Sequence, residues 1–191
     1  MMENLTRRPA LLRTEATRLL QNGLLDVLQQ YGSPHVVGSY ALDLMVWRDL
    51  DLQLVTDDLN LAQCFTLGGA LASLLMPVRM HFRNEHIART PGLPQGYYWG
   101  LYLGETAHGG WKIDVWATDR DQYAALCSAQ DALRGTLTPE MRRAILEIKA
   151  VVWNHPGYRQ TFTSQDVYHA VVQHGVTTVD EFWTFLRQKD A

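Results

Sequence analysis

Two neighbouring stretches decide the fold of this chain: Val36-Val37-Gly38-Ser39-Tyr40 and Asp49-Leu50-Asp51-Leu52-Gln53-Leu54-Val55. The second alternates strictly between polar and apolar residues, which is typical of a strand with one buried face. Asp49 and Asp51 then share the other face, and their carboxylates can reach a common point. Two adjacent carboxylates repel each other unless a cation lies between them. Because Mg²⁺ takes oxygen ligands and binds through one or two carboxylates plus substrate phosphates, the pair predicts a magnesium site.

Two further features distinguish this pair from an ordinary solvated strand face. Gly38-Ser39 ends a short apolar strand and begins a turn, where the backbone can approach a ligand closely and amide groups can hold a phosphate. Asp114 stands in the apolar strand Trp111-Lys112-Ile113-Asp114-Val115-Trp116, where an unpaired carboxylate is costly to bury. Three acids on neighbouring strands beside a glycine turn predict a two-metal phosphoryl-transfer site.

The other elements follow from periodicity and capping patterns. An apolar repeat predicts a helix over 8–31, and a second helix is expected over 59–75 with Asp57 or Asp58 as its cap. Gly68-Gly69 in that helix indicates close packing. Strands are expected over 78–87, 97–103 and 111–116, with a hairpin turn at Gly109-Gly110. Helices are expected over 119–133, 138–153, 164–174 and 179–188.

The pattern of predicted secondary structure changes near residue 118. Helical and strand patterns alternate before this point, and every predicted element after it is a helix. We therefore expect an α+β fold. Residues 1–118 form a core with a mixed or antiparallel sheet flanked by helices, and residues 119–191 form an all-helical C-terminal subdomain.

The order of these motifs resembles the nucleotidyltransferase superfamily, the polymerase-β-like group that includes small antibiotic nucleotidyltransferases. The matching residues are Gly38, Ser39, Asp49, Asp51 and Asp114, and the resemblance spans about residues 27–117. It implies transfer of a nucleoside monophosphate from a nucleoside triphosphate to a hydroxyl, with release of pyrophosphate. Asp49 and Asp51 would hold two Mg²⁺ ions, and Asp114 would help to hold the catalytic metal or take the acceptor proton. Gly38 and Ser39 would bind the donor phosphates.

Other residues extend this hypothesis. Lys149 can neutralise the triphosphate, as basic residues on helices of this superfamily sometimes do; the alternative is an exposed helix lysine. Lys112 shares the strand face of Asp114, so it either pairs with an acid or contacts phosphate. Tyr98 either packs on its strand or stacks on a base or an aromatic acceptor. We expect the acceptor in a cleft between the sheet and the helix over 138–153, which would bring Lys149 and Trp153 to it.

Composition restricts the partners. The chain has 191 residues and a net charge of −3, so it has no bulk electrostatic reason to coat an anionic membrane, and a long nucleic acid is an unfavoured acceptor. A small-molecule hydroxyl acceptor is expected instead. No window reaches the roughly 18 apolar residues of a membrane helix, and no apolar signal core follows the start, so a cytoplasmic protein is expected. The oligomeric state and the base of the donor stay open.

Other function classes lack their defining parts. The sequence contains no His-Glu-x-x-His, no Gly-Lys-Ser/Thr phosphate loop and no Gly-x-Ser-x-Gly elbow, which argues against a metalloprotease, a P-loop kinase and an α/β-hydrolase. Two alternatives remain. One is a catalytically idle member of the nucleotidyltransferase fold that binds nucleotide or a partner protein. The other is a metal-independent protein that binds a small ligand.

Overall fold

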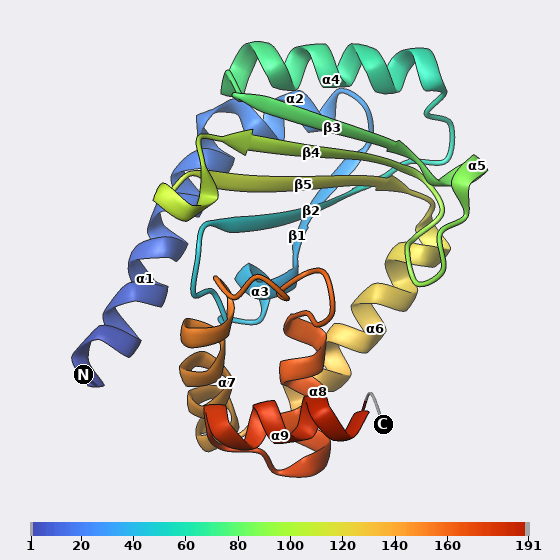
Figure 1. Ribbon diagram of the computed structural model, residues 1–191. Helices are drawn as coiled ribbons and strands as arrows, with labels where there is room; N and C mark the ends of the chain where they lie inside the picture. Colours follow the sequence, from blue (N-terminus) through green and yellow to red (C-terminus); the bar gives the residue numbers. More distant parts are fainter. Residues whose placement is uncertain (1, 190–191) are drawn as a thin grey trace.

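The computed structural model describes the backbone of residues 2–189 and the side chains of residues 8–189. A five-stranded mixed sheet has the order β1-β2-β5-β4-β3 (Figure 1). Only β2 and β5 run parallel; the other neighbouring pairs are antiparallel. The strands are β1 (Ser33–Val37), β2 (Asp49–Val55), β3 (Arg79–Asn84), β4 (Tyr97–Leu103) and β5 (Trp111–Thr118).

Helices cover the sheet and continue beyond it. Figure 1 shows α6 leading from the sheet to a group formed by α7, α8 and α9, while α4 lies at the other end of the molecule. This arrangement confirms the predicted α+β fold with a helical C-terminal part. The helices are α1 (Met2–Leu19), the π-helical turn η1 (Leu20–Leu24), α2 (Leu25–Gln29), α3 (Gly38–Ala41), α4 (Leu61–Leu75), α5 (Glu85–Ala88), the short η2 (Thr106–His108), α6 (Arg120–Thr136), α7 (Pro139–Val152), α8 (Ser164–His174) and α9 (Val179–Lys189).

Three predicted boundaries were wrong. The single helix over 8–31 begins at Met2 and breaks at Asn22 and Gly23, because Gly23 has a φ of +95° that no helix accommodates. The cap of α4 is Asn60 rather than either preceding aspartate, since Asn60 and Gln63 form a reciprocal capping box. The strand over 78–87 is shorter than expected, because its last residues form α5.

The alternation of β2 and β5 separates two faces of the sheet. Leu50, Leu52 and Leu54 of β2 are fully buried with Ile113 and Val115 of β5, and they belong to the core that includes α2 and α4. The intervening polar residues of both strands therefore point toward the C-terminal helices. The positions of the acids follow directly from this two-residue period.

The two adjacent glycines of α4 differ in the space that is available for a side chain. A Cβ on Gly68 would lie 2.5 Å from the Trp99 ring, whose Nε1 is held by a 3.0 Å hydrogen bond to Cys64 O, whereas a Cβ on Gly69 meets nothing within 4 Å. We expect Gly68→Ala to destabilise the fold by about 1–3 kcal/mol through overpacking. Gly69→Ala should stabilise it by about 0.5–1 kcal/mol through helix propensity. Urea unfolding of both variants measures these changes in the free energy of unfolding. Equal changes in the two variants would contradict the close contact between Gly68 and Trp99.

The connector between α3 and β2 belongs to a second hydrophobic cluster. Leu42, Leu44, Val46 and Trp47 are buried there among residues of α7, α8 and α9. This explains why the stretch is so apolar: it joins the sheet to the helical part. The division into domains at residue 118 stays a prediction.

Candidate active site

Three carboxylates converge on the face of the sheet that points toward the C-terminal helices. Asp51 of β2 stands directly opposite Asp114 of β5, and Asp49 precedes Asp51 on the same face. Each acid offers an oxygen that lies within 4.8 Å of the oxygens of the other two. The structure thus brings together the three acids selected from the sequence, as their shared strand faces predict. Their catalytic and metal-binding roles stay predictions.

Two neighbouring side chains contact the cluster. The ammonium of Lys112 pairs with Asp114 Oδ2 and lies 3.7 Å from Asp49 Oδ1. The hydroxyl of Tyr98 on β4 donates a 2.7 Å hydrogen bond to Asp114 Oδ1. Lys112 therefore pairs with acids, which is one of the two expectations for it. Tyr98 orients a carboxylate, a role that the sequence analysis missed.

Burial and mutual repulsion make the cluster electrostatically costly. Burial raises the pKa of the Asp49 carboxyl to about 6, although the Lys112 ammonium acts against this shift. Burial, together with the charges of Asp49 and Asp114, raises the pKa of Asp51 well above its usual range. For Lys112, burial acts to lower the pKa, but the neighbouring acids outweigh it and raise the pKa. These shifts reflect burial and repulsion among the acids, which the nearby cations offset only in part.

The donor set fits a divalent cation with oxygen ligands. Asp49 Oδ1 is buried and has no hydrogen-bond partner, so it is an acceptor without a donor. Such an atom costs free energy unless something positive satisfies it. A Mg²⁺ ion would bind oxygens of this cluster, Asp49 Oδ1 among them, and its charge would offset the repulsion among the carboxylates.

The Gly38-Ser39 turn lies against this cluster. Gly38 follows β1 with a φ of +64°, and a Cβ at this position would lie only 2.2 Å from Asp51 Oδ2. The backbone therefore approaches the carboxylate as closely as a residue without a side chain allows. Ser39 lines the same cleft as the three acids.

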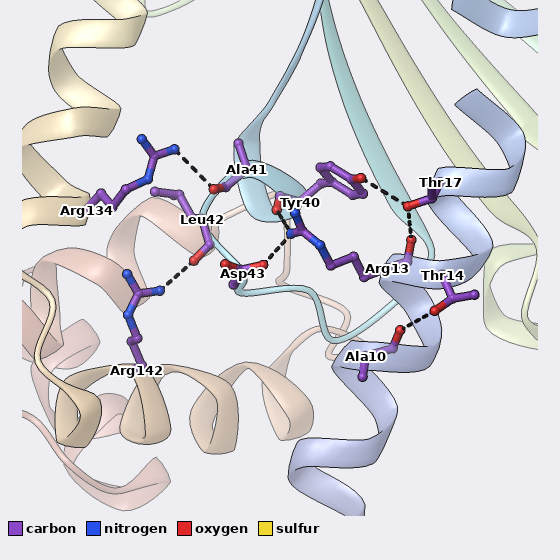
Figure 2. Close-up of polar contacts among 10 residues, drawn as sticks. All are labelled: Ala10, Arg13, Thr14, Thr17, Tyr40, Ala41, Leu42, Asp43, Arg134 and Arg142. Carbon is purple, nitrogen blue, oxygen red and sulfur yellow. Dashed lines mark hydrogen bonds and ion pairs between the residues drawn. The ribbon is translucent and has the colours of Figure 1, made fainter. Parts of the chain in front are cut away.

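Guanidinium groups from three helices hold the chain just after this turn (Figure 2). Arg13 of α1 donates to Tyr40 O at 2.8 Å and also pairs with Asp43. Arg134 of α6 donates to Ala41 O at 3.1 Å, and Arg142 of α7 donates to Leu42 O at 2.7 Å. Carbonyl groups at the end of a helix have few partners within it, and these arginines supply donors to the three carbonyl groups that follow the turn.

Lys149 is buried rather than exposed, so the alternative of an exposed helix lysine was wrong. Only 1% of the residue is accessible, and its ammonium donates to Leu44 O at 2.7 Å and to Tyr168 Oη at 3.0 Å. Burial lowers the pKa of Lys149. An ammonium has three N–H donors, and these two contacts use two of them.

A cleft of about 430 Å³ lies between the sheet and the helical part, where the sequence placed it. The acids and Lys149 line it. Trp153, also expected there, is not among the lining residues, because it stacks on Trp47 with ring centroids 5.6 Å apart. Further lining residues come from β5 (Trp116), α6 (Leu126 and Gln130) and α8 (Ser164 and Gln165).

Arg159 is a cleft residue that sequence reasoning missed. It lies in the loop between α7 and α8, has a φ of +65°, and its guanidinium carbon lies 4.7 Å from the centre of the Trp47 ring. Among the ion pairs of residues 8–189 it has no carboxylate partner. The loop has no periodic pattern, so no local signal marked this residue.

Three solved structures that share this fold are described in terms of RNA. One is a cytoplasmic RNA terminal U-transferase, with 12% identity, a TM-score of 0.57 and coverage of 91% of this chain and 55% of that one. A second is the polymerase core of TRAMP, an RNA surveillance complex, with 14% identity, a TM-score of 0.54 and coverage of 92% and 56%. A third is Cid1, described as an RNA terminal uridylyl transferase, with 14% identity, a TM-score of 0.53 and coverage of 91% and 53%.

These similarities show the fold. The chain has the fold of the polymerase-β-like nucleotidyltransferases over about nine tenths of its length, which confirms the predicted resemblance. The chain spans about half the length of these solved structures. No family model and no curated protein sequence matches it. None of the described helices combines the length and the apolar character that a membrane crossing requires.

Proposed function

We propose that this chain is a metal-dependent nucleotidyltransferase. It transfers a nucleoside monophosphate from a nucleoside triphosphate to a hydroxyl of a small, antibiotic-like molecule and releases pyrophosphate. The observation that carries this proposal is the convergence of Asp49, Asp51 and Asp114 at a cleft that also contains the Gly38-Ser39 turn. A complete set of acids favours an enzyme over an idle protein of the same fold.

The roles of the residues follow from their positions. Gly38 and Ser39 would bind the donor phosphates through backbone amides. Asp49 and Asp51 would hold the metal ions, and Asp114 would help to hold the catalytic ion or accept the proton of the acceptor hydroxyl. Mg²⁺, when bound, would neutralise the triphosphate and stabilise the charge that develops at phosphorus. Tyr98, through its bond to Asp114 Oδ1, keeps that carboxylate oriented.

The charges that line the cleft support a small acceptor. Three carboxylates are matched by three cationic side chains, those of Lys112, Lys149 and Arg159. The described lining therefore has no surplus of positive charge, which a protein needs to hold a nucleic acid strand. Because the solved relatives act on RNA by their own descriptions, RNA ends belong among the acceptors tested.

Lys149 is expected to contact the donor through its third N–H. Lys149→Met should weaken triphosphate binding by about tenfold, the effect of losing one charge-assisted hydrogen bond. Binding of each labelled triphosphate, measured at a temperature where the variant is folded, checks this. The matched control is Arg143→Met, which removes a cation from the exposed face of the same helix. Unchanged affinity in folded Lys149→Met would leave Lys149 with a purely structural role.

The proposal is tested by screening labelled nucleoside triphosphates with Mg²⁺ against a library of small hydroxyl compounds and RNA ends. Pyrophosphate release and product labelling are measured for the wild type and for Asp49→Asn. We expect release that depends on a small acceptor in the wild type alone. Nucleotide binding without release from any acceptor would instead favour the idle nucleotide-binding protein. Absence of nucleotide binding would overturn the proposal.

A further inference from the structure

The acid cluster already contains a cation that belongs to the chain. Lys112 stands opposite Asp49 in the register of β2 and β5 and two residues before Asp114, so its side chain emerges on the face that carries all three acids. Only 7% of this residue is accessible. Its backbone N–H donates to Arg48 O at 2.9 Å, which fixes the start of the side chain. The strand register therefore places the Lys112 ammonium within the acid cluster.

We propose that the Lys112 ammonium is a built-in counterion that takes the cation position between Asp49 and Asp114 and competes there with divalent ions. This inference rests on the proposed function only in treating the acid cluster as a metal centre. It concerns the free protein, before any nucleotide binds, and it makes Lys112 a positioning residue that sets how many ions the cluster accepts.

The contacts of Lys112 divide the cluster into two sides. Its ion pairs within 4.0 Å are with Asp114 and Asp49, and none is recorded with Asp51. The ammonium therefore lies on the Asp49–Asp114 side of the cluster, and we expect a divalent ion on the Asp49–Asp51 side, where no ion pair is formed. Asp49 Oδ1 lies 3.7 Å from the ammonium and has no hydrogen-bond partner, so it can still accept a metal ion. An ion bound there would leave the pair of Lys112 with Asp114 in place.

Charge counting leads to the same division. Lys149 and Arg159 line the same cleft but form no ion pair with the acids, so Lys112 is the cation counted with them. When all three carboxylates are ionised, they and the Lys112 ammonium carry a net charge of two negative, which a single divalent ion neutralises. A second divalent ion would meet a neutral cluster and would have to displace the ammonium from Asp114. Lysine can yield in this way, because its charge sits at the end of a flexible four-carbon stem. Removing the ammonium should therefore both create a second ion site and strengthen binding at the first.

The test titrates Mn²⁺ into the metal-free full chain and counts bound ions by electron paramagnetic resonance of the free ion. We expect a single bound ion per chain for the wild type and a second ion for Lys112→Met, with the first bound about tenfold more tightly. Lys112→Arg retains the charge and should bind a single ion like the wild type. When a chelator removes metal ions, the melting temperature of Lys112→Met should be lower than that of the wild type, because the acids lose their counterion. Added Mn²⁺ should remove this difference in melting temperature.

Several outcomes overturn the inference. They are two bound ions in the wild type, the same stoichiometry in Lys112→Met and the wild type, or no Mn²⁺ binding in either. If Lys112→Met cannot be kept folded without metal, the titrations of the wild type and Lys112→Arg still decide, because two ions in either contradict the counterion role. If the wild type bound two ions without nucleotide and also catalysed nucleotidyl transfer, this inference would be overturned and the proposed function would stand. If the expected numbers of bound ions were found but no donor gave transfer, this inference would stand and the proposed function would fail.

Discussion

Asp51→Asn should abolish nucleotidyl transfer while leaving the protein folded. The substitution keeps the shape of the side chain but removes a carboxylate oxygen from the only cluster of three acids among the described residues that can hold a metal. Metal ions contribute several kcal/mol to stabilising the charge that develops in phosphoryl transfer, so we expect a loss of about 10³-fold or more. Pyrophosphate release, with the donor and acceptor that the screen identifies, is the measurement.

Stability separates this prediction from a general folding defect. Asp51 is buried beside Asp49 and Asp114, which repel its charge, so the neutral side chain should melt at or above the wild-type temperature. Asp131→Asn is the matched control: it removes an exposed carboxylate from α6 and should leave transfer unchanged. Full activity in folded Asp51→Asn would contradict the metal-centre assignment.

Gly38→Ala should have the second-largest effect, because the new methyl group has no room. Its Cβ would lie 2.2 Å from Asp51 Oδ2, and a φ of +64° is costly for any residue with a side chain. We expect a loss of more than about 2 kcal/mol of stability. Transfer should fall by about 10²-fold or more, since the displaced Asp51 no longer meets its ligand. Thermal melting and pyrophosphate release report the two effects separately.

Gly175→Ala distinguishes backbone strain from the clash. Gly175, which ends α8, has the same φ of +64°, but a Cβ there meets nothing within 4 Å. This variant should lose only about 1 kcal/mol and retain transfer. If Gly38→Ala and Gly175→Ala lost the same stability and retained the same transfer activity, the close approach of Gly38 to Asp51 would have no effect on function.

The parts of the site that could be predicted from the sequence depend on local periodicity. The two-residue alternation of β2 and β5 places each acid on the face opposite the buried apolar residues. Because both apolar faces are buried on the same side of the sheet, the acids of the two strands share the other side. The helices predicted over 138–153 and 164–174 likewise begin within one residue of α7 and α8, whose N-caps are Thr138 and Thr163. These signals lie within a few residues of one another.

The residues that could not be predicted depend on partners far along the chain. Lys149 appeared as a lysine on an amphipathic helix, and its burial is set by Leu44 O, which lies 105 residues earlier. Tyr98 reaches Asp114 only because of the register between β4 and β5, which pairs Gly100 with Asp114 and leaves space above it. Partners so far along the chain have no local signature, and the residue-by-residue register of β4 and β5 depends on the geometry of their turn.

The bonds that tie residues 40–44 to three helices make this segment a mechanical linkage between the two halves of the molecule. Arg13 comes from the N-terminal helix α1, and Arg134 and Arg142 come from the C-terminal helices α6 and α7; all three donate to backbone oxygens of this segment (Figure 2). Lys149 of α7 donates to a fourth, Leu44 O. A rotation of the C-terminal helices against the sheet must either carry this segment along or break those bonds. A rotation that kept these bonds intact would widen the cleft and displace the Gly38-Ser39 turn together.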